Sequence, residues 1–358
     1  MNSVKDDYYN MILEKDNPSS FINIFEQQWL SFLNDYNAPY SNGKQLLVGN
    51  RLRPILCCWG YIHCCELEEI SSFVDIAQIS VSVEAIHKAS VIIDDVIDGD
   101  TKRRGVDCFH IQFSQDETLF FAVCLLAGAI KNLNSAMKNV VTTQSILSNA
   151  ISTLCDVISD MCMGAINEIT TNNNDRYNLD RIQKIINSET VSLLKNSFLL
   201  GYWATNQYDN TINKVFSKIG SRCAYIFQVM NDLEPFCNPK YIIKHKGNLN
   251  TDCMRSRKNI VIPYLYSVAS HKDKNELKCL LDSEKNYTQL KSLFDKYNIS
   301  DLIMEDINAI KSNIYLDIES LSEEKISAKW KQVFPFFVTD LLEYCESVTF
   351  GLQSKWNT

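Results

Sequence analysis

The segment VIIDDVIDGDTKRR places four carboxylates directly before two arginines. Asp94, Asp95 and Asp98 are separated by three or four residues, so on a helix their side chains project from one face. Carboxylates this close repel one another unless a divalent cation lies between them, and Mg²⁺ binds one or two carboxylates together with substrate phosphate oxygens. Arg103 and Arg104 carry planar, permanently charged groups that suit phosphate. The segment therefore predicts a metal-bridged diphosphate site.

A solvated acidic helix face is the alternative explanation for this motif. The residues before it favour a cavity, because the strongly apolar segment AIHKASVII leads into the aspartates. Aspartates that follow such a run are expected to line a cavity. His87 lies two helical turns before Asp94 and shares its face, where it is either a structural histidine or a ligand.

A second helix end repeats this pattern. The apolar run AYIFQVM leads into Asn231 and Asp232, a second group of oxygen ligands, and Pro235 is expected to kink or stop the helix. Upstream, the segment GNRLRP contains Arg53 and is either an anion site at a helix start or a solvated corner. The basic segment KHKGNLNTDCMRSRK is either a loop that reaches over a phosphate or an exposed surface loop.

Length and composition predict a compact, helix-rich protein. The chain has 358 residues, of which 46% are hydrophobic, with 11 glycines and 7 prolines. Helical periodicity recurs and no strand alternation persists, so the predicted class is all-α. Between the two motifs the predicted helices cover 118–132, 144–168 and 182–205. We predict a single helical domain over residues 1–358, with an N-terminal extension at 1–45, a motif-bearing core at 46–265 and C-terminal helices at 266–358.

Charge and cysteine usage exclude several functions. The net charge of −8, with no basic stripe to offset it, argues against a nucleic-acid partner. Thirteen cysteines, an odd number with adjacent pairs, fit neither a disulfide framework nor a zinc site and indicate a reducing compartment, by default the cytoplasm. The longest apolar run, 120–130, has roughly half of the ~20 residues that a membrane span needs. We therefore predict no transmembrane segment.

The order of these features, and above all the segment HKASVIIDDVIDGDTKRRG, resembles the trans-isoprenyl diphosphate synthase family. The resemblance covers about residues 49–263. It implies an all-α bundle, expected to be a homodimer, with a deep central cavity across which two aspartate-rich motifs face each other. These motifs would hold Mg²⁺, or Mn²⁺ in its place, against an allylic prenyl diphosphate. Ionisation would give an allylic cation, which isopentenyl diphosphate or another acceptor attacks.

The resemblance implies a role for each matching residue. Asp94 and Asp98 would be metal ligands supported by Asp95, and Asn231 and Asp232 would form the second metal site. The side chains expected to bind diphosphate are Arg103 for the allylic substrate and Arg53, His87 and Arg104 for isopentenyl diphosphate. Further substrate contacts would come from Thr190, Gln228 and Arg257.

Several positions depart from the family pattern. Asn50 replaces the lysine of a GKxxRP motif, Glu189 replaces the lysine of a KT motif, and Arg257 stands where the family has a lysine. The second motif lacks its first and last aspartates, at Asn231 and Pro235. A glutamate in place of a lysine weakens diphosphate binding unless other cations compensate. The leading hypothesis is a Mg²⁺-dependent prenyltransferase. The alternatives are a terpene-synthase-like enzyme that ionises and cyclises one prenyl diphosphate, and a weakly active partner subunit of a heteromeric prenyl diphosphate synthase.

Overall fold

The computed structural model describes residues 2–14, 16–35, 43–64, 70, 72–170, 175–240, 243, 259–282, 287–322 and 324–350. Within these residues, regular secondary structure is helical apart from one short hairpin, so the predicted all-α class is confirmed. The predicted basic loop at 244–258, which includes Arg257, lies outside the described residues.

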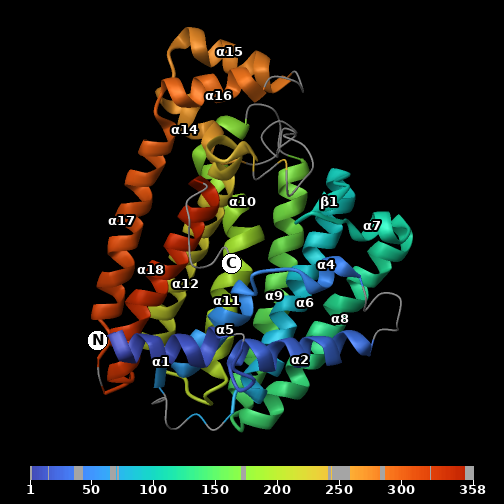
Figure 1. Ribbon diagram of the computed structural model, residues 1–358, viewed down its shortest axis with the longest axis vertical. Coiled ribbons are helices and arrows are strands. Elements are labelled where there is room, and N and C mark those ends of the chain that lie inside the picture. The colour runs from blue at the N-terminus through green and yellow to red at the C-terminus, as the bar shows by residue number, and fades with distance from the viewer. Residues whose placement is uncertain are drawn as a thin grey trace.

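The N-terminal half, blue to green in Figure 1, contains α1 (Asn2–Leu13), α2 (Phe21–Asn34), α4 (Lys44–Leu47), α5 (Leu52–Tyr61), η1 (Ile62–Cys64), α6 (Val74–Asp98), α7 (Phe109–Gln112), α8 (Gln115–Val140) and α9 (Gln144–Ile169). After α6, strands β1 (Lys102–Arg103) and β2 (Val106–Asp107) pair as an antiparallel hairpin. The C-terminal half contains η3 (Asp175–Tyr177), α10 (Leu179–Ile186), the π-helical segment η4 (Asn187–Val191), α11 (Ser192–Trp203), α12 (Asn210–Cys237), α14 (Val261–Val268), α15 (His271–Asp282), α16 (Tyr287–Lys296), α17 (Ile299–Glu319) and α18 (Ala328–Phe350).

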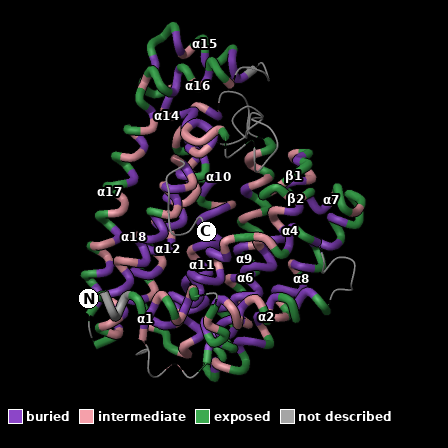
Figure 2. The backbone as a smooth tube through the Cα atoms, in the orientation of Figure 1, coloured by how far each residue is buried: buried purple, intermediate pink, exposed green. Residues whose placement is uncertain are grey.

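Helices α6 and α12 hold the two predicted motifs in the interior. α6 contacts α2, α5, α8 and α11, and α12 contacts α11, α17 and α18. One connected apolar core extends from Tyr8 in α1 to Cys345 in α18. Figure 2 shows the buried residues concentrated on the inner helices, with exposed residues on outer ones such as α15 and α17. Each motif therefore lies near the end of a helix that is anchored along most of its length.

Two glycines bring α5 and α11 into backbone contact. A Cβ atom at Gly60 would lie 2.0 Å from the Phe198 carbonyl oxygen, and one at Gly201 would lie 1.8 Å from the Cys57 carbonyl oxygen. No side chain fits at either position without separating the helices. Because α5 begins next to Arg53 and α11 follows directly after η4, this contact also fixes the distance between two walls of the cavity described below.

The predicted helices between the two motifs are present, with differences at their ends. α8 extends beyond 118–132 at both ends, and Ser114 and Glu117 form a capping box at its N-terminus. The predicted helix at 182–205 is divided into α10, η4 and α11, because one wider π turn interrupts the regular hydrogen bonding. Such π turns are frequent at functional sites.

Helix α12, which is predicted to kink or stop at Pro235, ends two residues after it. The helix continues to Cys237, and the Asn238 amide still donates to the Glu234 carbonyl at 2.8 Å. A proline in the final turn removes few helical hydrogen bonds, so the helix ends soon after it. The Pro235 carbonyl accepts a hydrogen bond from the Tyr287 hydroxyl at 2.6 Å, which ties this end of α12 to α16.

Three helices, α6, α8 and α9, are long and apolar enough to cross a membrane by length and composition alone. The prediction that no transmembrane segment is present is therefore not confirmed. In α6, 72% of the most apolar window is buried inside the protein, against 39% in α8 and 28% in α9. α6 is thus mainly a core helix, whereas α8 and α9 direct apolar side chains outward.

Replacing Gly201 by alanine is expected to destabilise the protein by about 3 kcal/mol or more, because the added methyl group would overlap the Cys57 carbonyl. Urea unfolding followed by circular dichroism measures the loss. Gly220→Ala is the matched control, since its Cβ would meet the Lys195 Cα at 3.1 Å and a smaller loss is expected. Equal stability of Gly201→Ala and the wild type would contradict the close contact between α5 and α11.

Candidate active site

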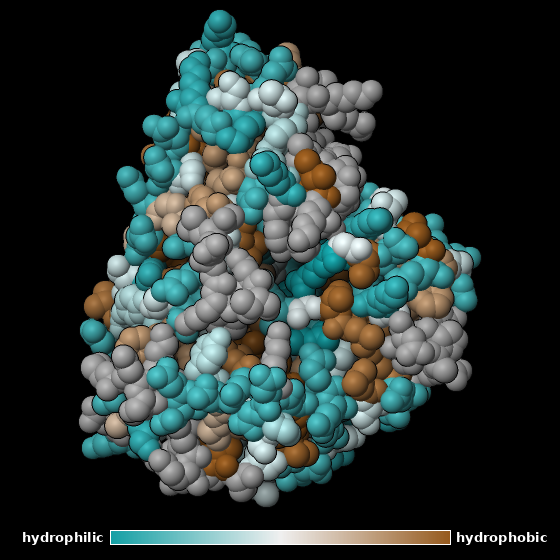
Figure 3. Space-filling model, viewed as in Figure 1, coloured by the Kyte–Doolittle hydropathy of each residue, from teal (hydrophilic) through white to brown (hydrophobic). Residues whose placement is uncertain are grey.

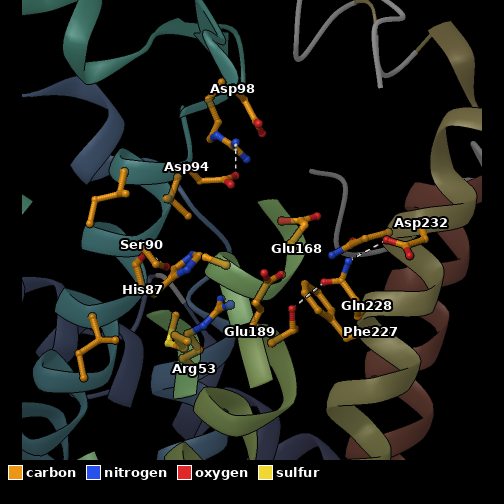
Figure 4. A pocket seen from close by; sticks show the side chains of 18 of the residues that line it. Arg53, His87, Ser90, Asp94, Asp98, Glu168, Glu189, Phe227, Gln228 and Asp232 are labelled. Atoms are coloured by element: carbon orange, nitrogen blue, oxygen red, sulfur yellow. Dashed lines mark hydrogen bonds and ion pairs between the residues drawn. The ribbon is translucent and has the colours of Figure 1, made fainter. Parts of the chain in front are cut away.

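A cavity of about 430 Å³ lies between the ends of α6 and α12. Figure 4 shows Arg53, His87 and Asp94 on one side and Gln228 and Asp232 on the other, with two glutamates between them. Deeper apolar lining comes from four helices: Ile86, Ile93, Leu126, Ile158, Met161 and Phe227. The cavity therefore combines charged walls with an apolar surface that suits a hydrocarbon chain.

Two aspartates of the first motif line the cavity and the third does not. The side chain of Asp94 is 55% exposed, and Asp98 is half-buried at the last residue of α6. Asp95, by contrast, is fully buried on the other side of the helix. Two of the predicted metal ligands thus share one wall. The prediction that Asp95 projects from the same face is wrong, because its carboxylate is buried away from the cavity, and its supporting role stays a prediction.

The Asp95 carboxylate is held by donors from two other segments. Arg103 Nε, on the hairpin, donates to Oδ1 at 2.5 Å, and the Gln45 side-chain amide donates to Oδ2. Gln45 is itself fixed, because its Oε1 accepts from the Phe109 amide at 2.7 Å. The Arg103 guanidinium also lies 3.5 Å from Asp94. Although burial opposes the charged form, these aspartates raise the pKa of Arg103 above its ordinary value.

Arg53, His87 and Arg104 meet on the same wall, and we call them the anion corner. Burial, opposed by Glu84 and reinforced by Arg104, lowers the pKa of Arg53 to about 10. Burial and then the charge of Arg53 lower the pKa of His87 well below its ordinary value. Within the described residues, Arg53 Nε has no hydrogen-bond partner. An arginine nitrogen without a partner, close to the charge of Arg104, forms a site that a bound anion would stabilise.

Asn50, in the loop before α5, belongs to the same cavity as the anion corner. It lines the cavity, and its side-chain amide donates to the Tyr344 hydroxyl on α18 at 3.1 Å. Burial raises the pKa of Tyr344, which keeps this hydroxyl protonated at neutral pH. The position at which the family pattern has a lysine is therefore occupied by a neutral amide bound to a neutral phenol.

A chain of hydrogen bonds forms the opposite wall. The Thr190 hydroxyl donates to Gln228 Oε1 at 2.9 Å, and Gln228 Nε2 donates to Asp232 Oδ1 at 2.7 Å. Asp232 Oδ2 accepts from the Ile260 amide at 2.8 Å, immediately before α14. Both oxygens of Asp232 therefore accept hydrogen bonds from the protein. Asn231, which also lines the cavity, is exposed toward it.

Two glutamates project into the space between these walls, Glu189 from η4 and Glu168 from α9 (Figure 4). Glu189 lies directly against Gly164, where an added Cβ would be 2.6 Å from its Cγ. Gly164 and Glu168 are one helical turn apart on α9. Glu189, which packs on Gly164, therefore lies against the same face of α9 that carries Glu168. The π turn at 187–191 thus delivers a negative charge to the cavity.

The donor groups fit a Mg²⁺ ion that is shared with a substrate. Asp94 and Asp98 offer charged oxygens on an open wall, and Mg²⁺ commonly takes one or two carboxylates together with waters and phosphate oxygens. In the part of the chain that the structure describes, no group of three or more acidic, histidine or cysteine side chains is arranged to hold a metal ion. Phosphate oxygens would therefore have to complete the coordination.

Comparison with known proteins identifies the family. The model of the polyprenyl synthetase family matches residues 39–297. The chain belongs to the polyprenyl synthetase family. Heptaprenyl diphosphate synthase component 2 of Bacillus subtilis (strain 168) is 26% identical over 286 residues, which cover 79% of this chain and 75% of that protein. Farnesyl diphosphate synthase of Buchnera aphidicola subsp. Acyrthosiphon pisum is 27% identical over 226 residues, which cover 62% of this chain and 75% of that protein.

Solved structures of polyprenyl synthetases share the fold. Heptaprenyl diphosphate synthase from Staphylococcus aureus superposes with a TM-score of 0.74 at 20% identity, covering 91% of this chain and 98% of that one. Decaprenyl diphosphate synthase from Rhodobacter capsulatus gives a TM-score of 0.74 at 15% identity, with 95% and 99% covered. The resemblance found in the sequence is confirmed by these matches.

Most polyprenyl synthetase positions predicted from the sequence meet at this one cavity. Its lining includes Arg53, His87, Asp94, Asp98, Arg103, Arg104, Thr190, Gln228, Asn231 and Asp232. Sequence reasoning did not identify Gln45, Glu168 or Tyr344. A single sequence carries little signal for them, because Gln45 lies in a four-residue helix and the other two lie on long amphipathic helices with many similar residues.

Asp94→Asn is expected to lower turnover about 10²–10³-fold without changing the Tm, because it removes one charged oxygen from an exposed cavity wall and leaves the shape intact. Product formation and a melting curve are measured together. Asp75→Asn, at the exposed opposite end of the same helix, is the matched control and is expected to keep full activity. Wild-type turnover in a folded Asp94→Asn protein would exclude a catalytic role for this carboxylate.

Proposed function

We propose that this polyprenyl synthetase is a Mg²⁺-dependent prenyltransferase that joins an allylic prenyl diphosphate to isopentenyl diphosphate or a related acceptor. The observation that supports this proposal most directly is the position of Asp94 and Asp98 beside the anion corner, at the mouth of an apolar cavity. Relatives named heptaprenyl, farnesyl and geranylgeranyl diphosphate synthase support the substrate class.

In this proposal the α6 wall binds both diphosphates. Asp94 and Asp98 would hold a Mg²⁺ ion, and this ion would supply positive charge to the diphosphate leaving group. Arg103 is close enough to Asp94, at 3.5 Å, to contact the same diphosphate. The anion corner binds the acceptor's diphosphate, so its cations are in place before the reaction begins. The apolar lining shields the allylic cation from water.

The opposite wall orients the reacting carbons. Asp232 fixes Gln228, and Gln228 fixes the Thr190 hydroxyl, so two polar groups keep a set direction toward the cavity. Oxygen dipoles there can stabilise a developing carbocation without supplying a nucleophile. We propose Asn231 as the remaining metal contact on this wall, weaker than an aspartate because its oxygen is neutral.

Incubation with allylic diphosphates of C5 to C20, Mg²⁺ and isopentenyl diphosphate tests the function. A longer prenyl diphosphate, detected by mass spectrometry, is the expected product, and chelation of the metal is expected to abolish it. The same incubations without isopentenyl diphosphate serve as the control. A cyclic or rearranged hydrocarbon in that control would favour the terpene-synthase alternative. The absence of any product in both sets would contradict the proposal.

We also propose that the protein works as a cytoplasmic homodimer joined through α8 and α9. These consecutive helices contact each other, and two places on them are relevant here: the start of α8 and the end of α9. Large apolar side chains are exposed at both places: Leu119, Phe120, Val123, Met163, Ile166 and Ile169. Figure 3 shows hydrophobic atoms over the region in which Figure 1 draws α7 and α8. An exposed apolar surface of this kind is typical of a protein interface.

Phe120→Asp is expected to convert the dimer to a monomer, because Phe120 is 75% exposed in the single chain and a charge there would be buried in the dimer. Light scattering after gel filtration gives the mass. Leu316→Asp is the matched control, since Leu316 is 62% exposed on the distant helix α17 and should leave the dimer intact. A monomeric wild type, or a dimeric Phe120→Asp protein, would contradict this interface.

A further inference from the structure

Lys88 is a buried lysine behind the anion corner, and the proposed mechanism does not use it. It follows His87 on α6 but does not line the cavity. Its Nζ donates to the Val48 carbonyl at 2.5 Å and to the Gln45 carbonyl at 3.0 Å, and it lies 3.8 Å from Glu84. The side chain is 6% exposed. Lys88 therefore holds the loop that connects α4 to α5 against helix α6.

Positive groups approach this loop from both sides. The point at which a Gly49 side chain would begin lies 3.0 Å from Arg104 Nη1 and 3.5 Å from Lys88 Nζ. Arg104 belongs to the cavity wall, whereas Lys88 lies behind it. Arg51 is also near, but its guanidinium is paired with Glu26 and Glu84 at 2.7 Å each. The backbone at Gly49 therefore lies between Lys88 Nζ and the Arg104 guanidinium.

The charges around Lys88 are not balanced. Burial lowers the pKa of Lys88 to about 7, while Glu84 opposes this shift and neighbouring arginines add to it. Glu84 is buried and faces more than one cation, since Arg51 and Lys88 both lie within 4.0 Å of it. The charged or titratable groups that face Lys88 from the surrounding segments are Glu84, His87, Arg51, Arg53 and Arg104, with Glu26 acting through Arg51.

We propose that Lys88 is a positioning residue of the anion corner. It fixes the segment 45–50, which comprises the end of α4 and the following loop, and it supplies positive charge behind the anion corner when a diphosphate is bound. The loop itself presents Asn50, which carries no charge, so helix α6 provides the cation on this side. The inference rests on the proposed function in one respect, namely that the bound group is the diphosphate of the acceptor.

This arrangement couples diphosphate binding to proton uptake. In the free protein, burial lowers the pKa of Lys88 to about 7 and so disfavours its charged form. A bound diphosphate favours the charged form and raises the pKa of Lys88, so binding draws a proton from solvent. The contribution of Lys88 to affinity is complete below pH 7, where the lysine is charged in both states. It declines as the pH rises above about 7, because the proton must then be taken up at increasing cost.

Calorimetric titration with isopentenyl diphosphate alone tests this inference. Lys88→Gln keeps a donor for the loop carbonyls but removes the charge. We expect it to bind about tenfold more weakly at pH 7, the order of effect of one partly buried charge. Repeating the titration in buffers of different ionisation enthalpy measures proton uptake, which should be smaller in Lys88→Gln. Lys44→Gln is the matched control, because Lys44 is exposed on the neighbouring helix α4.

A second variant distinguishes charge from structure. Lys88→Gln combined with Asn50→Lys returns a cation to the cavity face and is expected to recover most of the lost affinity, with melting curves confirming that both proteins are folded. Wild-type affinity and proton uptake in Lys88→Gln would overturn the inference. A loss that Asn50→Lys fails to recover would also overturn it, since Lys88 would then act only through the fold.

Turnover measured in parallel separates this inference from the proposed function. A wild-type protein that binds isopentenyl diphosphate but forms no prenyl product contradicts the proposed function, and the effect of Lys88 on binding still stands. A wild-type protein that forms product, together with a Lys88→Gln variant that binds as tightly, supports the function and refutes the role of Lys88.

Discussion

The buried carboxylate of Asp95 is the group on which the cavity mouth depends. It accepts hydrogen bonds from Arg103 on the hairpin and from Gln45 on α4, so one side chain joins the end of α6 to the hairpin that follows it and to the distant helix α4. A buried carboxylate without such donors would be strongly destabilising. The hairpin and α4 must therefore meet at the end of α6. Their position turns Asp94 and Asp98 toward the cavity and places Arg103 beside them.

In the anion corner, positive groups repel one another, and a bound anionic substrate would reduce this repulsion. Burial lowers the pKa values of Arg53 and His87, and the charge of Arg104 lowers both further. Helix packing keeps them together, because Arg53 lies at the start of α5, which is fixed against α11, and His87 lies within α6. Cations held in place in this way need no rearrangement when an anion arrives, which favours both binding and catalysis.

The two walls of the cavity differ in charge. Among the lining residues that the structure describes, every arginine and histidine comes from α5, α6 or the segment around the hairpin. The wall formed by α12 and η4 contributes amides, hydroxyls and carboxylates, including Glu189 where the family pattern has a lysine. The cationic lining is therefore concentrated on the α6 wall. The η4 wall is suited to orienting a carbocation or a polar acceptor.

The sequence by itself determined the fold class and the two motifs, because both are local properties. Helical periodicity requires only residues a few positions apart, and the spacing of Asp94 and Asp98 already places these two on one helix face. It also predicted that Asp95 supports its neighbours. The ends of the elements were less certain: α8 is longer than expected, and the π turn at 187–191 has no periodic signature.

Only the tertiary structure decided which polar groups meet across the cavity. Gln45 contacts Asp95 over fifty positions of sequence, Asn50 contacts Tyr344 on the C-terminal helix, and Asp232 holds the amide of Ile260. Hydrogen bonds of this kind depend on side-chain directions and on helix packing, which no local pattern encodes. For the same reason Lys88 is one more polar residue in the sequence, and becomes a buried cation behind the anion corner only when the loop before α5 folds over it.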